Sequence, residues 1–235
     1  MHRFRVEEIQ GDICALSKEE ANHALKVLRM RVGDMCEISD GQRIFEGTLL
    51  ENARIQVGRE LPNRESCARI TLYQGYPKAD KLELIAQKFT ELGGVEIVPV
   101  LTERSVARPD EFDKKKERFE RIALEATKQT GRAAAPRIAP MLKFDAALAA
   151  FEKHELKILF WEDAEDTRLK DVLRMYPDAR DIAYFIGPEG GLSAEEAGKI
   201  QKAGAVITTL GARILRAETA AVAGCALIQA MWGDI

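Results

Sequence analysis

The chain has 235 residues and a mass of 26.2 kDa, which is enough for one large domain or for a small domain followed by a larger one. Apolar residues make up 46% and charged residues 31%, which excludes a disordered chain, a collagen-like repeat and a disulfide-rich scaffold. Lysine and arginine total 35 against 38 acidic residues, so the net charge of −3 excludes a strongly basic nucleic-acid binder. Any RNA binding therefore has to come from local basic patches.

The cysteines and the first residues indicate where the protein works. Cys14, Cys36, Cys67 and Cys225 lie far apart, with no C-x-x-C pair and no histidine at ligand spacing, so neither a zinc site nor a disulfide framework is predicted. The start MHRFRVEEIQGD lacks the apolar core of a signal peptide, and no stretch approaches the ~18 apolar residues of a membrane span. We expect a cytoplasmic protein with reduced thiols and no metal.

Residues 1–65 predict a small β-barrel domain. A short helix is expected after Ser17, a candidate N-cap with Glu20 three residues further on. Its expected apolar face consists of Ala21, Ala24, Leu25 and Leu28. Residues 35–62 then alternate apolar and polar side chains between turn signals, a pattern typical of antiparallel hairpins. The polar run 62–66 predicts the domain boundary, with the second domain over 66–235.

The second domain predicts an α/β fold. Apolar runs of strand length alternate with amphipathic stretches of helix length, and continuous apolar strands are typical of a parallel sheet buried on both faces. Residues 111–130 predict a charged helix whose KKK run is a solvated face or, alternatively, an RNA contact. Residues 217–232 predict a final helix with small residues on its buried face, which ends at Gly233.

The segment GPEGGLSAEE, residues 187–196, directly follows an apolar strand and leads into a helix with Ser193 and Glu196 at capping-box positions. In open parallel sheets the carboxyl ends of the strands bind ligands, and glycines let the backbone approach a ligand closely. The segment is therefore a candidate ligand loop; a tight turn that needs glycine geometrically is the alternative. Neither the dinucleotide fingerprint nor the triphosphate loop is present, which disfavours nicotinamide and ATP sites.

The segment LGARILRAETA, residues 210–220, also follows a predicted strand. Ile214 and Leu215 stand there between Arg213 and Arg216. The apolar pair can wall a flat aromatic ligand while the arginines meet phosphate or carboxylate; core packing of the pair is the alternative. For Glu218, the simplest interpretation is that its negative charge only stabilises the positive N-terminus of the last helix.

Taken together, these motifs resemble those of the SPOUT methyltransferase superfamily, and almost the whole chain resembles its RsmE-type family of 16S rRNA uridine-N3 methyltransferases. The resemblance rests on six motifs, which follow one another along the chain as HALKVLRMRVGD, KADKLELIAQKFTELGG, TERSV, ERIALEATKQTGRAAAP, GPEGGLS and LGARILRAETA. It implies a trefoil-knotted catalytic domain, a PUA-like RNA-binding domain, a homodimer with sites at the subunit interface, and S-adenosylmethionine as cofactor.

The resemblance also implies functional residues. The cofactor pocket would comprise Phe160, Trp161, Gly187, Pro188, Glu189, Gly190, Gly191, Leu210, Gly211, Ile214, Leu215 and Thr219. A buried strand end explains Phe160 and Trp161 equally well. Methylation of uracil N3 requires loss of the imide proton and stabilisation of the resulting anion, so a base and a cation are expected. The cation candidates are Arg132 and Arg104, and the proton acceptor candidates are Glu125 and Glu189.

Alternative interpretations remain open for several of these residues. Glu125 can instead form a helix-surface pair with Lys128 or Gln129, and His23 can be a core histidine. The expected RNA partner is small-subunit rRNA within the 30S subunit, and the candidate residues for contacting it are Arg3, His23, Lys26, Arg29, Arg31, Lys81 and Lys88.

Two other functions are weighed: a SPOUT methyltransferase acting on another rRNA or tRNA nucleotide, and a nonenzymatic RNA-binding assembly factor.

Overall fold

The computed structural model describes residues 1–9, 11–106, 112–164 and 167–235, and they form two compact units. The first comprises Met1–Glu65 with Thr127–Ala135, and the second comprises Ser66–Ala126 with Pro136–Ile235. The sequence predicts residues 127–135 in the second domain, whereas they pack with the first unit. The reason is Glu65, whose carboxylate accepts hydrogen bonds from the Arg132 guanidinium and from the backbone of residues 133 and 134.

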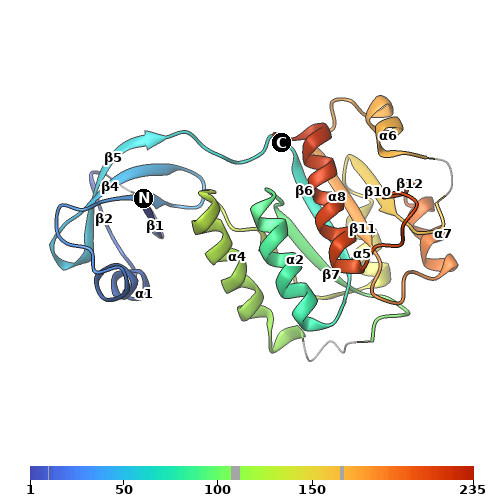
Figure 1. Ribbon diagram of the computed structural model, residues 1–235, viewed down its shortest axis with the longest axis horizontal. Helices are drawn as coiled ribbons and strands as arrows, with labels where there is room; N and C mark the ends of the chain where they lie inside the picture. Colours follow the sequence, from blue (N-terminus) through green and yellow to red (C-terminus); the bar gives the residue numbers. More distant parts are fainter. Residues whose placement is uncertain (10, 107–111, 165–166) are drawn as a thin grey trace. The chain divides into compact units, whose positions relative to one another are not determined.

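The first unit contains a five-stranded sheet in the order β1-β3-β4-β5-β2 (Figure 1). Its strands are β1 (His2–Arg5), β2 (Ile13–Ala15), β3 (Met35–Ser39), β4 (Ile44–Leu49) and β5 (Arg54–Leu61), with a 3-10 turn, η2 (Glu51–Ala53), before β5. The strands β3, β4 and β5 form the predicted antiparallel hairpins, while β1 pairs with β3 in parallel. Alternate side chains of these strands, among them Phe4, Ile38 and Ile55, build a core of their own.

A short helix packs against this sheet and begins as predicted. Ser17 caps α1 (Lys18–Asn22) and accepts a hydrogen bond from the Glu20 amide at 3.2 Å. The helix then widens into a π-helix, η1 (His23–Val27), which the 3.6-residue spacing does not predict. In the wider turn Ala24 is buried but Leu25 is 46% exposed, so Leu25 leaves the predicted apolar face.

The second unit confirms the predicted α/β class. Its seven-stranded sheet has the order β12-β10-β11-β6-β7-β8, with β9 also paired to β7, and the strand pairs among the described residues are all parallel. The strands are β6 (Arg69–Gly75), β7 (Glu96–Leu101), β8 (Arg137–Ile138), β9 (Leu142–Lys143), β10 (Leu156–Phe160), β11 (Asp181–Ile186) and β12 (Val206–Thr208). The predicted trefoil knot stays a prediction.

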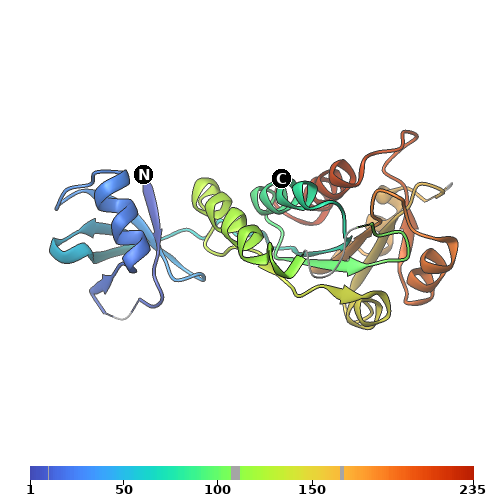
Figure 2. The same ribbon diagram turned by 90° about the horizontal axis from the view of Figure 1, so that it is seen from below.

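Helices cover both faces of this sheet (Figures 1 and 2). One face packs against α2 (Ala79–Glu91), α4 (Lys116–Thr130), α6 (Leu169–Met175) and α8 (Ala217–Trp232), and the other against α5 (Phe144–Phe151) and α7 (Ala194–Lys202). The strands alternate accordingly: in β11, Tyr184 faces the first layer and Phe185 the second. The last helix has its predicted bounds, and residue 111, the predicted start of the charged helix, lies outside the described residues.

Within the described ranges no helix has the length and apolar character needed to span a bilayer. The same ranges contain no group of three or more histidine, cysteine, aspartate or glutamate side chains arranged to hold a metal ion. All four cysteines are free thiols, and only Cys67 is exposed.

Candidate functional site

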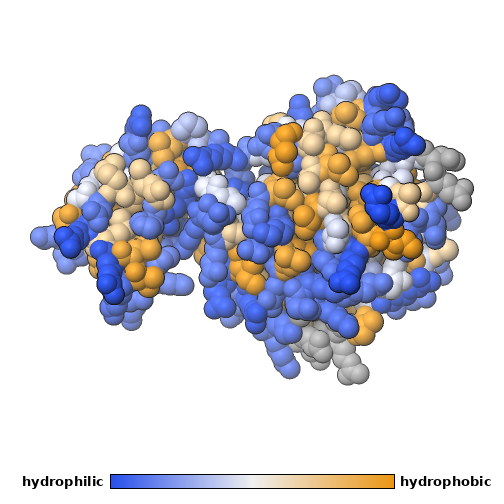
Figure 3. Space-filling view, in the orientation of Figure 1, coloured by the Kyte–Doolittle hydropathy of each residue, from blue (hydrophilic) through white to orange (hydrophobic). Residues whose placement is uncertain are grey.

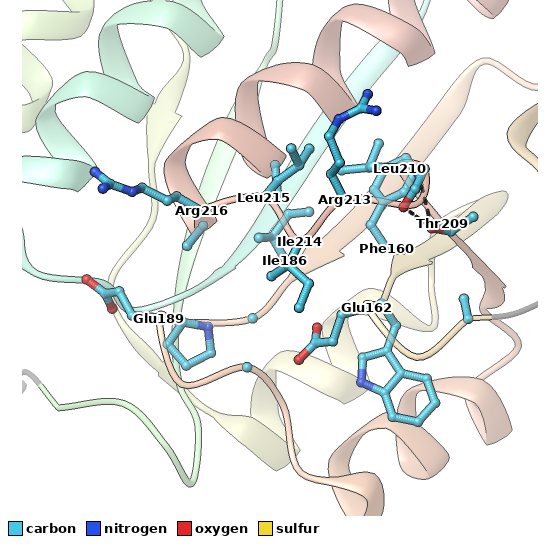
Figure 4. Close-up of a pocket in the computed structure, with 18 of the residues that line it drawn as sticks. Phe160, Glu162, Ile186, Glu189, Thr209, Leu210, Arg213, Ile214, Leu215 and Arg216 are labelled. Carbon is cyan, nitrogen blue, oxygen red and sulfur yellow. Dashed lines mark hydrogen bonds between the residues drawn. The ribbon is translucent and has the colours of Figure 1, made fainter.

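A cavity of about 710 Å³ opens in the second unit where three neighbouring strands end. Its lining begins with Phe160 at the end of β10, Ile186 at the end of β11 and Thr209 just after β12 (Figure 4). This is the edge at which open parallel sheets bind ligands, and the volume suits a small molecule the size of a nucleoside derivative. The two motif segments of the sequence therefore meet at one cavity.

The cavity collects most of the cofactor residues that the sequence predicts. Those in its lining are Phe160, Trp161, Gly187, Pro188, Glu189, Gly191, Leu210, Gly211, Ile214 and Leu215. Gly190 and Thr219 are not among the lining residues. Gly190 instead meets Arg104: a Cβ on this glycine would lie 3.1 Å from the Arg104 Cβ. Thr219 is exposed on the first turn of α8.

The loop of residues 187–191 depends on its glycines and on the end of β6. Gly191 has φ +70, and a Cβ there would stand 2.4 Å from Glu162 Oε1, so the position disfavours any side chain. The side-chain amide of Gln74 donates to the Gly187 carbonyl at 3.1 Å, and the absence of a side chain at Gly75 leaves room for Pro188. The loop is thus both a glycine-dependent turn and a wall of the cavity.

A second loop supports this one from outside the cavity. Arg104 donates to the Gly190 carbonyl at 3.1 Å, and the Glu103 amide donates to Glu196 Oε1 at 2.9 Å. Glu196 also completes the predicted capping box with Ser193 at the start of α7. The TERSV element therefore acts, in this structure, as a brace for the glycine-rich loop.

The opposite wall comes from the connection between β12 and α8. Ile214 is 89% exposed and lines the cavity together with Ile186 (Figure 4), so the alternative of core packing is wrong for this residue. Leu210 packs against the core and lines the cavity as well. An aliphatic side chain held open to solvent beside a cavity is the arrangement expected of a wall that an apolar ligand covers.

Aromatic side chains close one end of the cavity. Phe160 is 6% exposed and packs edge-on against Tyr184 at 5.9 Å, so it belongs to the core and to the lining at once. Trp161 follows it, and its buried Nε1 has no hydrogen-bond partner among the described residues. Glu162 comes next in the chain and brings an exposed carboxylate into the cavity (Figure 4). The sequence prediction missed Glu162, although it directly follows two predicted residues.

Charged side chains gather at the other end. Lys81 Nζ, from the first turn of α2, lies 3.4 Å from Glu189 Oε1 and 3.2 Å from Glu218 Oε2. Desolvation raises the pKa of Glu189, but the Lys78 amide and the Lys81 ammonium outweigh it and hold this pKa below its ordinary value. A carboxylate with a lowered pKa is a weaker base, which argues against Glu189 as the proton acceptor.

The other predicted catalytic residues lie elsewhere. Arg132 belongs to the first unit, is 4% exposed and binds Glu65 with an N–O distance of 2.6 Å, and its predicted role as the cation for the uracil anion stays a prediction. Glu125 is exposed on α4 and is absent from the cavity lining. Its alternative role as a partner of Lys128 is not observed, because Lys128 pairs with Glu20. Of the four candidates, Glu189 belongs to the glycine-rich loop and lines the cavity, and Arg104 donates a hydrogen bond to that loop.

The RNA-binding candidates separate into two groups. Arg3 is buried and paired with Glu37, Lys81 lies in the cavity between two carboxylates, and Lys88 pairs with Glu91. The structure therefore assigns these three cations to ion pairs. The remaining candidates, His23, Lys26, Arg29 and Arg31, lie together in and just after η1, where Lys26, Arg29 and Arg31 are exposed. His23 also meets the Phe4 ring edge-on, so its core interpretation is partly right.

Comparisons with known proteins identify relatives of both units. Residues 63–229 match the family model described as an RNA methyltransferase domain, and residues 16–57 match the one described as an RNA methyltransferase PUA domain. The Bacillus subtilis protein named ribosomal RNA small subunit methyltransferase E is 32% identical over 221 residues, covering 88% of this chain and 85% of its own.

Two solved structures share the whole fold. Ribosomal RNA small subunit methyltransferase E of Neisseria gonorrhoeae, bound to S-adenosylmethionine, has a TM-score of 0.90 and 31% identity, with 100% of this chain and 99% of that one covered. A Legionella pneumophila methyltransferase in complex with the same cofactor has a TM-score of 0.86 and 30% identity, with 100% and 98% covered.

Proposed function

Because this chain belongs to the RNA methyltransferase family, we propose that it transfers the methyl group of S-adenosylmethionine to N3 of one uridine in small-subunit (16S) rRNA, on the assembled 30S subunit. The observation that carries the proposal is the cavity at the ends of β10, β11 and β12, built from both motif segments of the chain. Two fold relatives with TM-scores of 0.86 and 0.90 bind this cofactor.

The residues of the cavity fit S-adenosylmethionine. Phe160 and Leu210 at one end, with Ile214 above, offer apolar surface to an adenine ring. The other end of the cavity is polar, with the ion pair of Lys81 and Glu189, and this surrounding suits the charged methionine part of the cofactor. The cofactor, when bound, supplies a methyl group that is already activated by a positively charged sulfur.

The chain's own contribution to the chemistry is then mainly positioning. Glu189 is a poor base because its pKa is lowered, and Arg132 is committed to Glu65. Arg104 keeps its candidacy as the cation for the uracil anion, because its guanidinium is held at the Gly190 carbonyl. Holding a nucleophile and an activated methyl in line removes a large part of the barrier without a strong base.

We assign RNA contact to the segment 23–31 of the first unit. It combines a π-helix with Arg29 at φ +55, a left-handed backbone that a non-glycine residue rarely adopts. This conformation leaves Lys26, Arg29 and Arg31 exposed on one short stretch. Such a local cluster supplies the phosphate contacts that the overall charge of −3 does not.

The proposal includes a homodimer, as the resemblance implies. Apolar side chains gather on the face of the second unit around α8 (Figure 3), where Leu227 is 40% and Ile235 is 67% exposed. Exposed apolar surface of this kind is typical of an interface. Sedimentation of the purified chain tests this part: a species of twice 26.2 kDa supports it, and a monomer at micromolar concentration removes it.

The decisive experiment uses labelled S-adenosylmethionine and small ribosomal subunits from cells that lack the enzyme. Label recovered by mass spectrometry as 3-methyluridine at one position of 16S rRNA supports the proposal. Label on another nucleoside keeps the reaction but moves the target. A parallel reaction with free 16S rRNA tests the substrate form, and label on free rRNA but not on the subunits would remove the requirement for the assembled subunit. Tight cofactor binding with no transfer to any RNA would leave only an assembly factor.

A further inference from the structure

We propose that Lys81 is a positioning residue for the cofactor. The ammonium group of Lys81 joins the two walls of the cavity and holds them in the arrangement that binds S-adenosylmethionine. The inference rests on the proposed function as far as the cofactor is concerned. It concerns three charged side chains from three different elements: Lys81 from α2, Glu189 from the loop after β11, and Glu218 from the first turn of α8.

The geometry places Lys81 between both walls. Its Nζ lies 3.4 Å from Glu189 on the glycine-rich wall and 3.2 Å from Glu218 at the end of the opposite wall. The three side chains are 23%, 25% and 13% exposed, so water screens the pairs only in part. One cation thereby links two segments that come from different strand ends.

Each partner is itself fixed to an element of secondary structure. Glu189 Oε1 accepts the Lys78 amide at 3.0 Å, which ties the glycine-rich loop to the start of α2. Glu218 stands in the first turn of α8, where the helix dipole favours a carboxylate, and the rim of the cavity runs directly into this turn. Movement of either wall would therefore separate Lys81 from one of its partners.

The pair with both carboxylates also keeps Lys81 charged. Desolvation lowers the pKa of Lys81, but Glu218 and Glu189 together raise it above the ordinary value of a lysine. The ammonium is therefore present throughout the neutral range. This makes Lys81 unsuited to proton transfer and suited to a permanent electrostatic link.

A second role for the same ammonium makes the opposite prediction. If Lys81 binds the carboxylate of the cofactor directly, Glu189 and Glu218 compete with the ligand for it, and removing either charge frees the ammonium and tightens binding. If Lys81 acts by joining the walls, removing Glu218 breaks one of its two links and weakens binding. The sign of the Glu218→Gln effect therefore separates the two roles.

The test is calorimetric titration of S-adenosylmethionine into the full chain and five variants. We expect Lys81→Met to bind about tenfold more weakly, within the range of coupling between linked sites. Glu218→Gln should also weaken binding. The double variant Lys81→Met/Glu218→Gln should bind no more weakly than Lys81→Met alone, because the loss of Lys81 already removes its link to Glu218. Lys81→Arg should retain most of the affinity. Lys88→Met is the matched control, because it breaks a pair with Glu91 on the same helix away from the cavity.

Methyl transfer supplies a second readout that a purely structural role would not move. The Michaelis constant for S-adenosylmethionine should rise in Lys81→Met while kcat at saturation stays near that of the wild type. Wild-type affinity in Lys81→Met, or tighter binding by Glu218→Gln, would overturn the inference. A wild-type chain that binds no S-adenosylmethionine would overturn the proposed function instead, so the two failures are distinguishable.

Discussion

Gly191 is the position at which a single methyl group tests the structure of the cavity most directly. Its φ of +70 puts the backbone in the left-handed region, and a Cβ would lie 2.4 Å from Glu162 Oε1. A non-glycine residue in this conformation costs ~1–2 kcal/mol of folding free energy. The carboxylate of Glu162 can swing away at little further cost, but it then leaves the place it occupies in the cavity.

We therefore expect Gly191→Ala to lower the free energy of unfolding by ~1–2 kcal/mol, and to weaken cofactor binding in addition. Urea unfolding of the full chain measures the first effect and calorimetric titration the second. Gly190→Ala is the matched control: the neighbouring glycine has no positive φ, and its Cβ would meet Arg104, with the Arg104 Cβ at 3.1 Å and the Arg104 carbonyl oxygen at 3.5 Å. The loop is the same, but the backbone strain of the left-handed conformation is absent.

The contribution of the clash can be separated from that of the backbone. Replacing Glu162 with Ala removes the atom that a Cβ at Gly191 would meet, so Glu162→Ala should relieve part of the damage in the double variant and leave the backbone cost. Equal unfolding free energies for Gly191→Ala and Gly190→Ala would refute the reasoning, because they would show that the left-handed conformation carries no cost here.

Three further predictions follow from the ion pairs and thiols. Arg132→Ala should lower the free energy of unfolding by ~1–3 kcal/mol because it leaves the Glu65 carboxylate without its buried partner, and unchanged stability with lost methyl transfer would favour the catalytic role instead. Because the folded pKa of Glu189 lies below its ordinary 4.5, its stabilisation is present above that pH and is lost as the pH falls further; Glu189→Gln should therefore flatten the acid limb of unfolding curves. A thiol reagent should label Cys67 rapidly in the folded protein, and rapid labelling of more than one thiol would contradict the burial of the others.

Most of the fold could be predicted because its signals are local. Apolar runs buried on both faces, such as 181–186, are typical of central parallel strands, and they form one sheet as expected. The π-helix after Asn22 gives no such signal, since its extra residue per turn depends on packing rather than on spacing. The return of residues 127–135 to the first unit depends on Glu65, which only the folded chain brings near them.

The candidate site shows the same division between local and distant information. Both motif segments could be predicted to form it, because glycines after a strand mark a ligand loop without any knowledge of the fold. Lys81 could not, since a lysine on an amphipathic helix has the same sequence signal whether it meets RNA or a carboxylate. Its partners, Glu189 and Glu218, are separated from it in the chain by whole strands and helices.

Arg132 shows what chemical need alone leaves undecided. Uracil methylation needs a cation, and an arginine in a recognisable motif meets that need on paper. In the structure Arg132 is 4% exposed and paired with Glu65, so contact with a nucleotide would require breaking a pair that stabilises its own unit. With Glu189 also held charged by its neighbours, the cavity contains an ordered charge network rather than a strong base. Under the proposed function, the link through Lys81 therefore acts on how tightly the walls hold the cofactor, and its loss should change the affinity for S-adenosylmethionine more than the rate at saturation.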